Sequence, residues 1–127
     1  MRNLVIIAAA LLSLTLPSSV AAQDFDRGVS AYNDGDYPTA LREFRLAAEQ
    51  GSASAQYNLG VMYYNGQGVP QNYQLAYMWF SRAAAKGVER AASARDKAAG
   101  NMTPEQIGRA QQLSAECFNR NYQGCEK

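Results

Sequence analysis

Residues 55–87 read AQYNLGVMYYNGQGVPQNYQLAYMWFSRAAAKG, and this stretch decides the fold. Two segments with apolar residues at helical spacing flank an inner loop that contains Gly66, Gly68 and Pro70. A helical hairpin of this kind leaves one apolar face uncovered, so it requires a neighbour of similar shape. The stretch therefore predicts one unit of a stacked helical repeat.

An earlier copy of this unit precedes it in the chain. The second helices of the two copies match with a shift of 36 residues, as at Phe44 and Phe80. The first helices match with a shift of 32, as at Gly28 and Gly60, because the later copy has four more residues in its inner loop. We expect each glycine to let the first helix lie close to the second, with phenylalanine filling the space between layers.

The residue pattern of the later unit is specific. It runs Ala55-x-x-x-Leu59-Gly60-x-Met62-Tyr63, Gly66-x-Gly68-Val69, Ala76-x-x-Trp79 and Ala83-Ala84-x-x-Gly87. This pattern resembles the Sel-one-like repeat, a sister of the tetratricopeptide repeat, in an exported bacterial member. The earlier unit resembles the shorter, tetratricopeptide-like form. The resemblance implies a helical scaffold that gathers protein partners and is not catalytic.

The predicted fold is all-α, a short α/α solenoid of two helix-turn-helix repeats plus a C-terminal helical cap. The repeats span about 24–51 and 52–87, and the cap spans 88–127. The cap continues the repeat pattern only at its start, so a degenerate third repeat and a simple cap both stay open. Within it, Thr103-Pro104-Glu105-Gln106 predicts the start of the last helix, with a hydroxyl cap and a capping box.

The first 22 residues predict a secretory signal peptide. Arg2 supplies a charged start, residues 4–16 form an apolar core, and Val20-Ala21-Ala22 offers small residues for cleavage. The apolar core is too short for a comfortable membrane span, although an uncleaved anchor is the alternative. We therefore expect the mature domain, 23–127, to be periplasmic or secreted, without a stable membrane anchor after cleavage.

The charge balance and the residue types limit the possible chemistry. Twelve lysines and arginines stand against eleven acids, so cleavage after Ala22 removes Arg2 and leaves a net charge of zero. This balance argues against nucleic-acid binding. The chain has no histidine, and its acids form no defensible catalytic pair, so we expect no enzyme activity, no metal and no cofactor. Basic residues near Gly87 alternate with acids, which is typical of a solvated helical face, at Arg82, Lys86, Glu89, Arg90, Arg95, Asp96 and Lys97.

Cys117 and Cys125 are the only cysteines in the chain. In an oxidising compartment we expect them to form a disulfide that folds the tail back on the last helix. The loop-entropy model gives this nine-residue loop a stabilisation of about 2.6 kcal/mol. A reactive or metal-binding pair is the alternative.

The predicted binding surface is formed by the first helix of each unit, which lines the concave side of the related tetratricopeptide fold. Aromatic, valine and asparagine residues recur there with spacing i, i+4, i+7 and i+8, which places each set on one helical face. The predicted protein- or peptide-binding residues are Phe25, Val29, Tyr32, Asn33, Tyr57, Val61, Tyr64, Asn65, Ser93 and Lys97. Rings supply contact area and amides bond an extended backbone, but these rings also suit packing between repeats, and both interpretations stay open.

Together these patterns predict a non-catalytic protein- or peptide-binding adaptor of the bacterial cell envelope. One alternative is an immunity- or inhibitor-type protein that blocks a single enzyme or toxin. A weaker alternative is a cell-wall-binding or hydrolytic module. The patterns name neither the partner nor the oligomeric state.

Overall fold

The computed structural model describes residues 20–122 and 125–126, and this part of the chain holds six α-helices and no strand. They are α1 (Val20–Asn33), α2 (Tyr37–Glu49), α3 (Ala53–Asn65), α4 (Tyr73–Ala85), α5 (Glu89–Ala99) and α6 (Pro104–Asn119). The all-α prediction is confirmed. Most of the predicted signal peptide, residues 1–19, lies outside the described residues, and Val20–Ala22 form the first turn of α1. No helix in the described ranges is both long and apolar enough to cross a membrane.

Side-chain caps start four of the helices, and the one at Thr103 is where the sequence predicts it. Asp36, Ser52 and Asn72 each accept a hydrogen bond from the backbone N–H three residues later, at the starts of α2, α3 and α4. At α6, Thr103 and Gln106 exchange the two hydrogen bonds of a capping box. Such bonds satisfy backbone groups that have no partner within the helix, so they hold each helix start in place.

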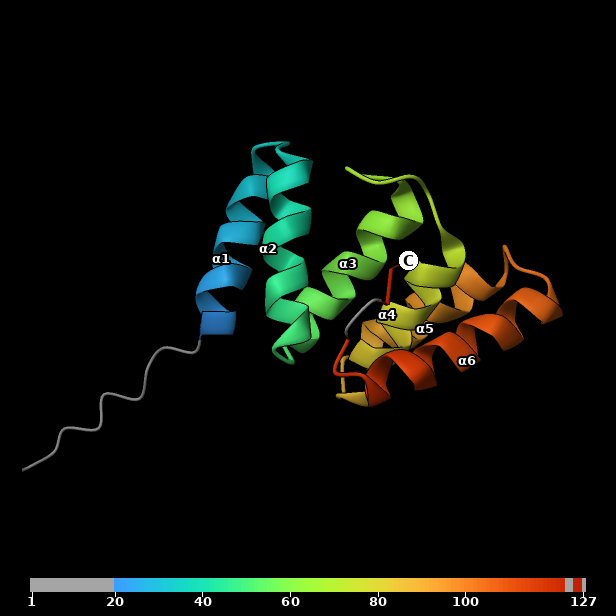
Figure 1. Cartoon of the computed structure of the whole chain (residues 1–127). Coiled ribbons are helices and arrows are strands. Elements are labelled where there is room, and N and C mark those ends of the chain that lie inside the picture. Colours follow the sequence, from blue (N-terminus) through green and yellow to red (C-terminus); the bar gives the residue numbers. More distant parts are fainter. Residues whose placement is uncertain (1–19, 123–124, 127) are drawn as a thin grey trace, which may run out of the picture.

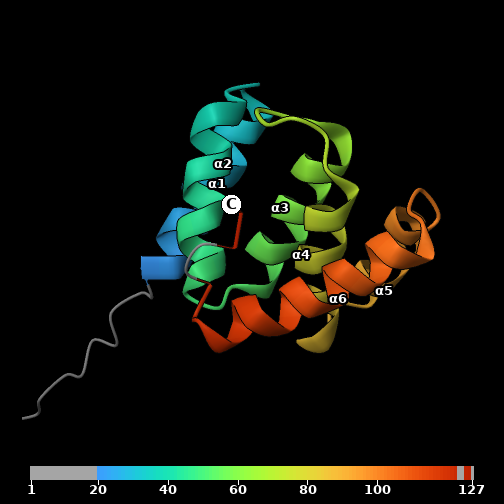
Figure 2. The same cartoon turned by 45° about the vertical axis from the view of Figure 1, so that its right-hand side comes forward.

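The helices stack as two hairpins followed by a cap (Figure 1). α1 packs against α2, α3 packs against α4, and the hairpins meet where α2 contacts α3. α4 then packs against both α5 and α6, so the last two helices cover the outer side of the second hairpin (Figure 2). This arrangement is the predicted solenoid with its C-terminal helical cap.

Glycine and phenylalanine set the spacing inside each hairpin, as predicted. A Cβ added to Gly28 would lie 2.6 Å from ring atoms of Phe44, and one added to Gly60 would lie 2.5 Å from ring atoms of Phe80. Both rings are buried, and Trp79 is buried beside them in the same core. Any larger residue at either glycine would push the two helices of its hairpin apart.

The C-terminal tail, which follows α6 and is described at residues 120–122 and 125–126, joins the cap to both repeats. The predicted disulfide links Cys117 in α6 to Cys125, with Cα atoms 5.2 Å apart. The hydroxyl of Tyr122 accepts hydrogen bonds from Arg82 Nε at 2.7 Å and from Gln56 Nε2 at 3.4 Å. The tail also contacts the first hairpin, because Glu126 forms an ion pair with Arg45 of α2. The tail is therefore a structural element of the stack.

Candidate functional site

The ten predicted binding residues lie on α1, α3 and α5, the first helix of each unit. Asparagine, serine and lysine side chains are exposed on this surface, at Asn33, Asn65, Ser93 and Lys97. The aromatic and valine side chains are half-buried, at Phe25, Val29, Tyr32, Tyr57, Val61 and Tyr64. The surface is hollowed where α1 meets α3 and again where α3 meets α5. Nine of the ten predicted binding residues line one of the hollows described below. Ser93 lines none of these hollows.

The first hollow lies between α1 and α3 and has a volume of about 220 Å³. Phe44 of α2 contributes to its lining beneath the two helices. The other lining residues come from α1 and α3, namely Val29, Tyr32, Asn33, Asn58 and Val61.

The second hollow lies between α3 and α5 and has a volume of about 230 Å³. Phe80 of α4 takes the place of Phe44, and the remaining lining is Tyr57, Tyr64, Asn65, Ala94 and Lys97. Tyr64 and Asn65 follow Tyr32 and Asn33 by the 32-residue shift. The two hollows therefore occupy the same place in successive units, and the internal repeat of the sequence is a repeat of surface shape.

The aromatic rings on this surface contact buried rings beneath them and are also partly exposed to solvent. Tyr57 packs on Phe80 with ring centroids 5.6 Å apart, and Phe25 packs on Phe44 at 5.8 Å. Tyr32 also contacts Phe44, at 6.5 Å. Each ring nevertheless keeps part of its surface exposed. These ring contacts therefore lie within each hairpin, not between repeats as one sequence interpretation has it, and the partly exposed rings leave a binding role as a prediction.

The longer inner loop of the second unit contacts the first unit at Tyr32, a residue that lines the first hollow. Gln67 Nε2 donates a hydrogen bond to the hydroxyl of Tyr32 at 2.8 Å. A Cβ at Gly68 would lie 3.0–3.1 Å from atoms of Tyr37, so the loop rests on the start of α2. The four additional residues therefore brace the second unit against the first. Sequence reasoning missed Gln67 because its partner lies 35 positions away.

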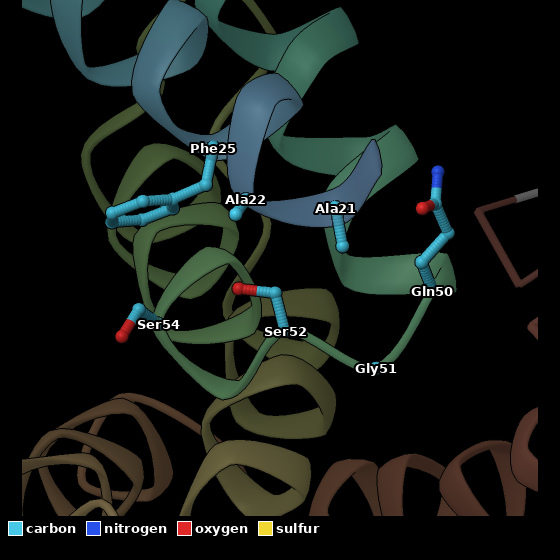
Figure 3. A pocket seen from close by; sticks show the side chains of 7 residues that line it. All are labelled: Ala21, Ala22, Phe25, Gln50, Gly51, Ser52 and Ser54. Carbon is cyan, nitrogen blue, oxygen red and sulfur yellow. The ribbon is translucent and has the colours of Figure 1, made fainter. Parts of the chain in front are cut away.

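A third hollow, of about 440 Å³, lies where the start of α1 faces the turn between α2 and α3. Figure 3 shows Ala21, Ala22 and Phe25 on one side of it and Ser52 and Ser54 on the other. Phe25 is the counterpart of Tyr57, so this hollow continues the same surface toward the N-terminus. Ala21 and Ala22 precede the predicted cleavage point, so cleavage there would remove part of its wall.

A buried acid in α1 has no signal in the sequence pattern. Asp24 is 3% exposed, forms an ion pair with Arg27 and accepts a hydrogen bond from Gln50 Nε2 at 3.2 Å. The helix begins at Val20, earlier than the expected start near Asp24, so this carboxylate lies in the second turn and faces α2. Its position ties α1 to the end of α2.

A second group of charged side chains lies under the tail, away from the hollows. Burial raises the pKa of Tyr63 to about 12, and the charge of Glu126 adds to the effect, while Arg45 opposes it. Burial also raises the pKa of Glu49, again with help from Glu126. Within residues 20–122 and 125–126, no three histidine, cysteine or acidic side chains lie together as a metal site.

Comparison with known proteins identifies the repeat. The family model of the Sel1 (Sel-one-like) repeat matches residues 28–52 and 53–88. These two segments contain the paired glycines, the inner loop and both phenylalanines described above. Sel1 repeats generally mediate protein–protein interaction and are generally not catalytic.

Three curated relatives share part of the chain. It is 38% identical over 65 residues to an exopolysaccharide production negative regulator of Rhizobium meliloti (strain 1021), covering 51% of this chain and 24% of that protein. The protein of the same name from Rhizobium leguminosarum bv. viciae is 37% identical with the same coverage. A putative sel1-like repeat-containing protein L18 of Acanthamoeba polyphaga mimivirus is 48% identical over 40 residues, 32% of this chain and 7% of that protein. The chain therefore spans about a quarter or less of the length of these relatives.

Proposed function

We propose that this chain is a non-catalytic protein- or peptide-binding adaptor of the bacterial cell envelope, because its residues 28–88 carry two Sel1 repeats. Its binding surface is the face formed by α1, α3 and α5. The observation that carries this proposal is the pair of equivalent hollows, each lined by at least one half-buried tyrosine and an exposed asparagine.

The chemistry of the hollows suits an extended peptide. An extended chain advances by about 3.3 Å per residue, with successive side chains on opposite sides, so side chains on the same side of a bound peptide can enter the hollows. Tyrosine edges supply apolar contact from rings already held against Phe44 and Phe80, so little conformational entropy is lost on binding. Asn33 and Asn65 stand beside the hollows with amides that can pair with a peptide backbone.

The envelope location rests on residues 1–22 of the sequence, which have the charged start, apolar core and small cleavage residues of a signal peptide. The disulfide fits an oxidising compartment. Sequencing the N-terminus of protein recovered from the periplasmic fraction tests this part. We expect it to begin at Gln23, and recovery only from the cytoplasm with an intact Met1 would contradict export.

The names of two relatives favour a regulatory form of this role. Both are called negative regulators of exopolysaccharide production, and each is similar to this chain over 65 residues. A module that binds proteins exerts negative control by holding its partner in an inactive state. We propose that this chain acts on its partner in that way, which brings the adaptor close to the inhibitor-type alternative.

Partner capture followed by a binding measurement tests the surface. The partner is captured from envelope extract by crosslinking, identified, purified, and titrated against the Asn33→Ala/Asn65→Ala/Tyr64→Ala variant. We expect the affinity to fall by about tenfold or more, equivalent to about 1.4 kcal/mol. The control is Arg109→Ala/Asn119→Ala, which alters two exposed residues on α6.

Circular dichroism first establishes that all three proteins are equally helical. An unchanged affinity in the α1/α3 variant, or an equal loss in the α6 control, would place the binding surface elsewhere. A stoichiometric complex that silences the partner's activity supports the regulatory form.

A further inference from the structure

Each of the two hollows has a tyrosine, an asparagine and a phenylalanine at equivalent positions, but the hollows differ in charge. With the 36-residue shift, Arg90 in α5 replaces Ser54 in α3, and Lys97 replaces Val61. Lys97 lines the second hollow directly, whereas the first hollow has Val61 in that place. The lining of the first hollow contains no charged residue. Two cations are thus added at one end of an otherwise repeated surface.

Both cations are held close to the second hollow. The guanidinium of Arg90 lies 4.3 Å from the centroid of the Tyr57 ring, and Tyr57 lines the hollow. This cation–π contact restrains a long side chain that would otherwise move freely in water. Lys97 is exposed beside Tyr64 and Asn65 in the lining.

Neither cation is neutralised by a neighbouring acid. Within the described residues, neither Arg90 nor Lys97 forms an ion pair. The acids of α5 are engaged or placed elsewhere, because Asp96 pairs with Arg95 at 3.2 Å and Glu89 lies in the first turn, where the helix dipole favours it. No acid lines the second hollow. Its positive charge is therefore available to a ligand, unlike the balanced solvated face that the sequence predicts.

We propose that the second hollow binds an aspartate or glutamate side chain of the partner, while the first hollow takes an uncharged side chain of the same peptide. This inference rests on the proposed peptide-binding function and adds the chemical class of the peptide. Lys97 and the Asn65 amide supply donors to the carboxylate, and charge assistance makes such bonds stronger than neutral ones. Because the hollow is open to water, the interaction depends on salt.

A selection experiment tests the inference even while the natural partner is unidentified. Random peptides displayed on phage are selected against the purified protein, and the enriched sequences are compared with the starting library. We expect an excess of acidic residues at one position and of uncharged, apolar residues a short distance away. A synthetic peptide of the enriched sequence is then titrated against the variants.

The variant Lys97→Gln removes the charge and keeps a side chain of comparable length. We expect it to bind the peptide about two- to fivefold more weakly, as fits a solvent-accessible charge pair, and to show a smaller salt dependence, since Arg90 keeps its charge. Arg109→Gln, on the exposed face of α6, is the matched control and should bind as the native protein does. Val61→Lys copies the charge into the first hollow, and selection on it should yield a second acidic position.

The outcomes separate this inference from the function on which it rests. If peptides are enriched without acidic residues, or bind Lys97→Gln as tightly as the native protein, the acidic class is wrong and the peptide-binding surface stands. If no peptide is enriched, both the inference and the proposed surface are overturned. If Arg109→Gln weakens binding as much as Lys97→Gln, the effect is one of overall charge, and the assignment to this hollow is wrong.

Discussion

The ring of Tyr122 stacks on the ring of Trp79, with centroids 5.8 Å apart and planes 17° apart. Tyr122 lies in the tail after α6, and Trp79 lies in the core of the second hairpin. The backbone of Tyr122 has φ of 67°, a left-handed conformation that a tyrosine adopts only where its surroundings hold it. The stack and the bonds to its hydroxyl therefore fix the tail against the repeats.

Removing the Tyr122 ring should expose Trp79, the only tryptophan in the chain. For Tyr122→Ala we expect a red-shifted tryptophan emission and a loss of about 3 kcal/mol in the free energy of unfolding, because a buried ring is replaced by a cavity. Tyr122→Phe keeps the stack and should keep the emission, at a cost of about 1 kcal/mol for the hydroxyl bonds. Native emission and stability in Tyr122→Ala would show that the tail does not cover Trp79 in solution.

Reducing the Cys117–Cys125 disulfide should release the same tail. Urea unfolding with and without a dithiol reductant is expected to show a stability difference of about 2.6 kcal/mol, the value for a nine-residue loop. The Cys117→Ser/Cys125→Ser variant should match the reduced protein and be insensitive to the reductant. An equal effect of the reductant on this variant would mean that the loss has another cause.

Two glycines in helices should respond in opposite directions to alanine. Gly60→Ala places a Cβ 2.5 Å from the buried Phe80 ring, so we expect a loss of about 1–3 kcal/mol in urea unfolding. Gly108 lies within α6 with no atom within 4 Å of the added Cβ. Gly108→Ala should therefore stabilise the protein by about 0.5–1 kcal/mol. Stabilisation by both substitutions would refute close packing at Gly60.

The raised pKa of Tyr63 predicts a loss of stability in alkali. Its ordinary pKa is 10.0, and in the fold it is about 12, chiefly because of burial. Between these values the unfolded state releases the phenol proton and the folded state retains it, so the free energy of unfolding falls as pH rises. The contribution is complete below pH 10.0 and is lost as pH rises through about 12.

Comparison of the native protein with Tyr63→Phe checks this pH dependence. The stability advantage of the native protein over the variant should shrink as the pH rises from 10.0 to about 12. Glu126→Gln should lower the pKa of Tyr63, as followed by NMR of ring-labelled tyrosine, because the Glu126 charge raises it. A constant stability difference across this range would contradict the burial of Tyr63.

Sequence reasoning predicted which helical faces carry the candidate binding residues, but it did not predict the residues that surround them. Helical spacing placed Tyr32 and Asn33 on one face, and the 32-residue shift placed Tyr64 and Asn65 on the next, where two hollows now bring them together. It did not find Gln67, which bonds to Tyr32, or the contribution of Phe44 and Phe80 to the lining. Those contacts depend on where a loop or a second helix lies in space, which periodicity within one helix does not report.

The sequence by itself determined the helical hairpins, the capped start of the last helix and the small residues at the close crossings. Thr103 and Gly60 act on neighbours within a few residues or within one hairpin, so local pattern and repetition are enough to reveal them. Only the tertiary structure decided the partners of the tail. Gln56 meets Tyr122 across 66 positions, and a polar side chain has no periodic signal that names so distant a partner.

The tertiary structure also decided that the second hollow carries a positive charge that is unpaired among the described residues. In the sequence, Arg90 and Lys97 stand among acids and are typical of a solvated face. In the fold, α5 turns these two cations toward Tyr57 and the hollow, while Asp96 pairs with Arg95. A count of neighbouring charges averages over all sides of a helix, whereas packing selects one side and thereby decides which charges a partner meets.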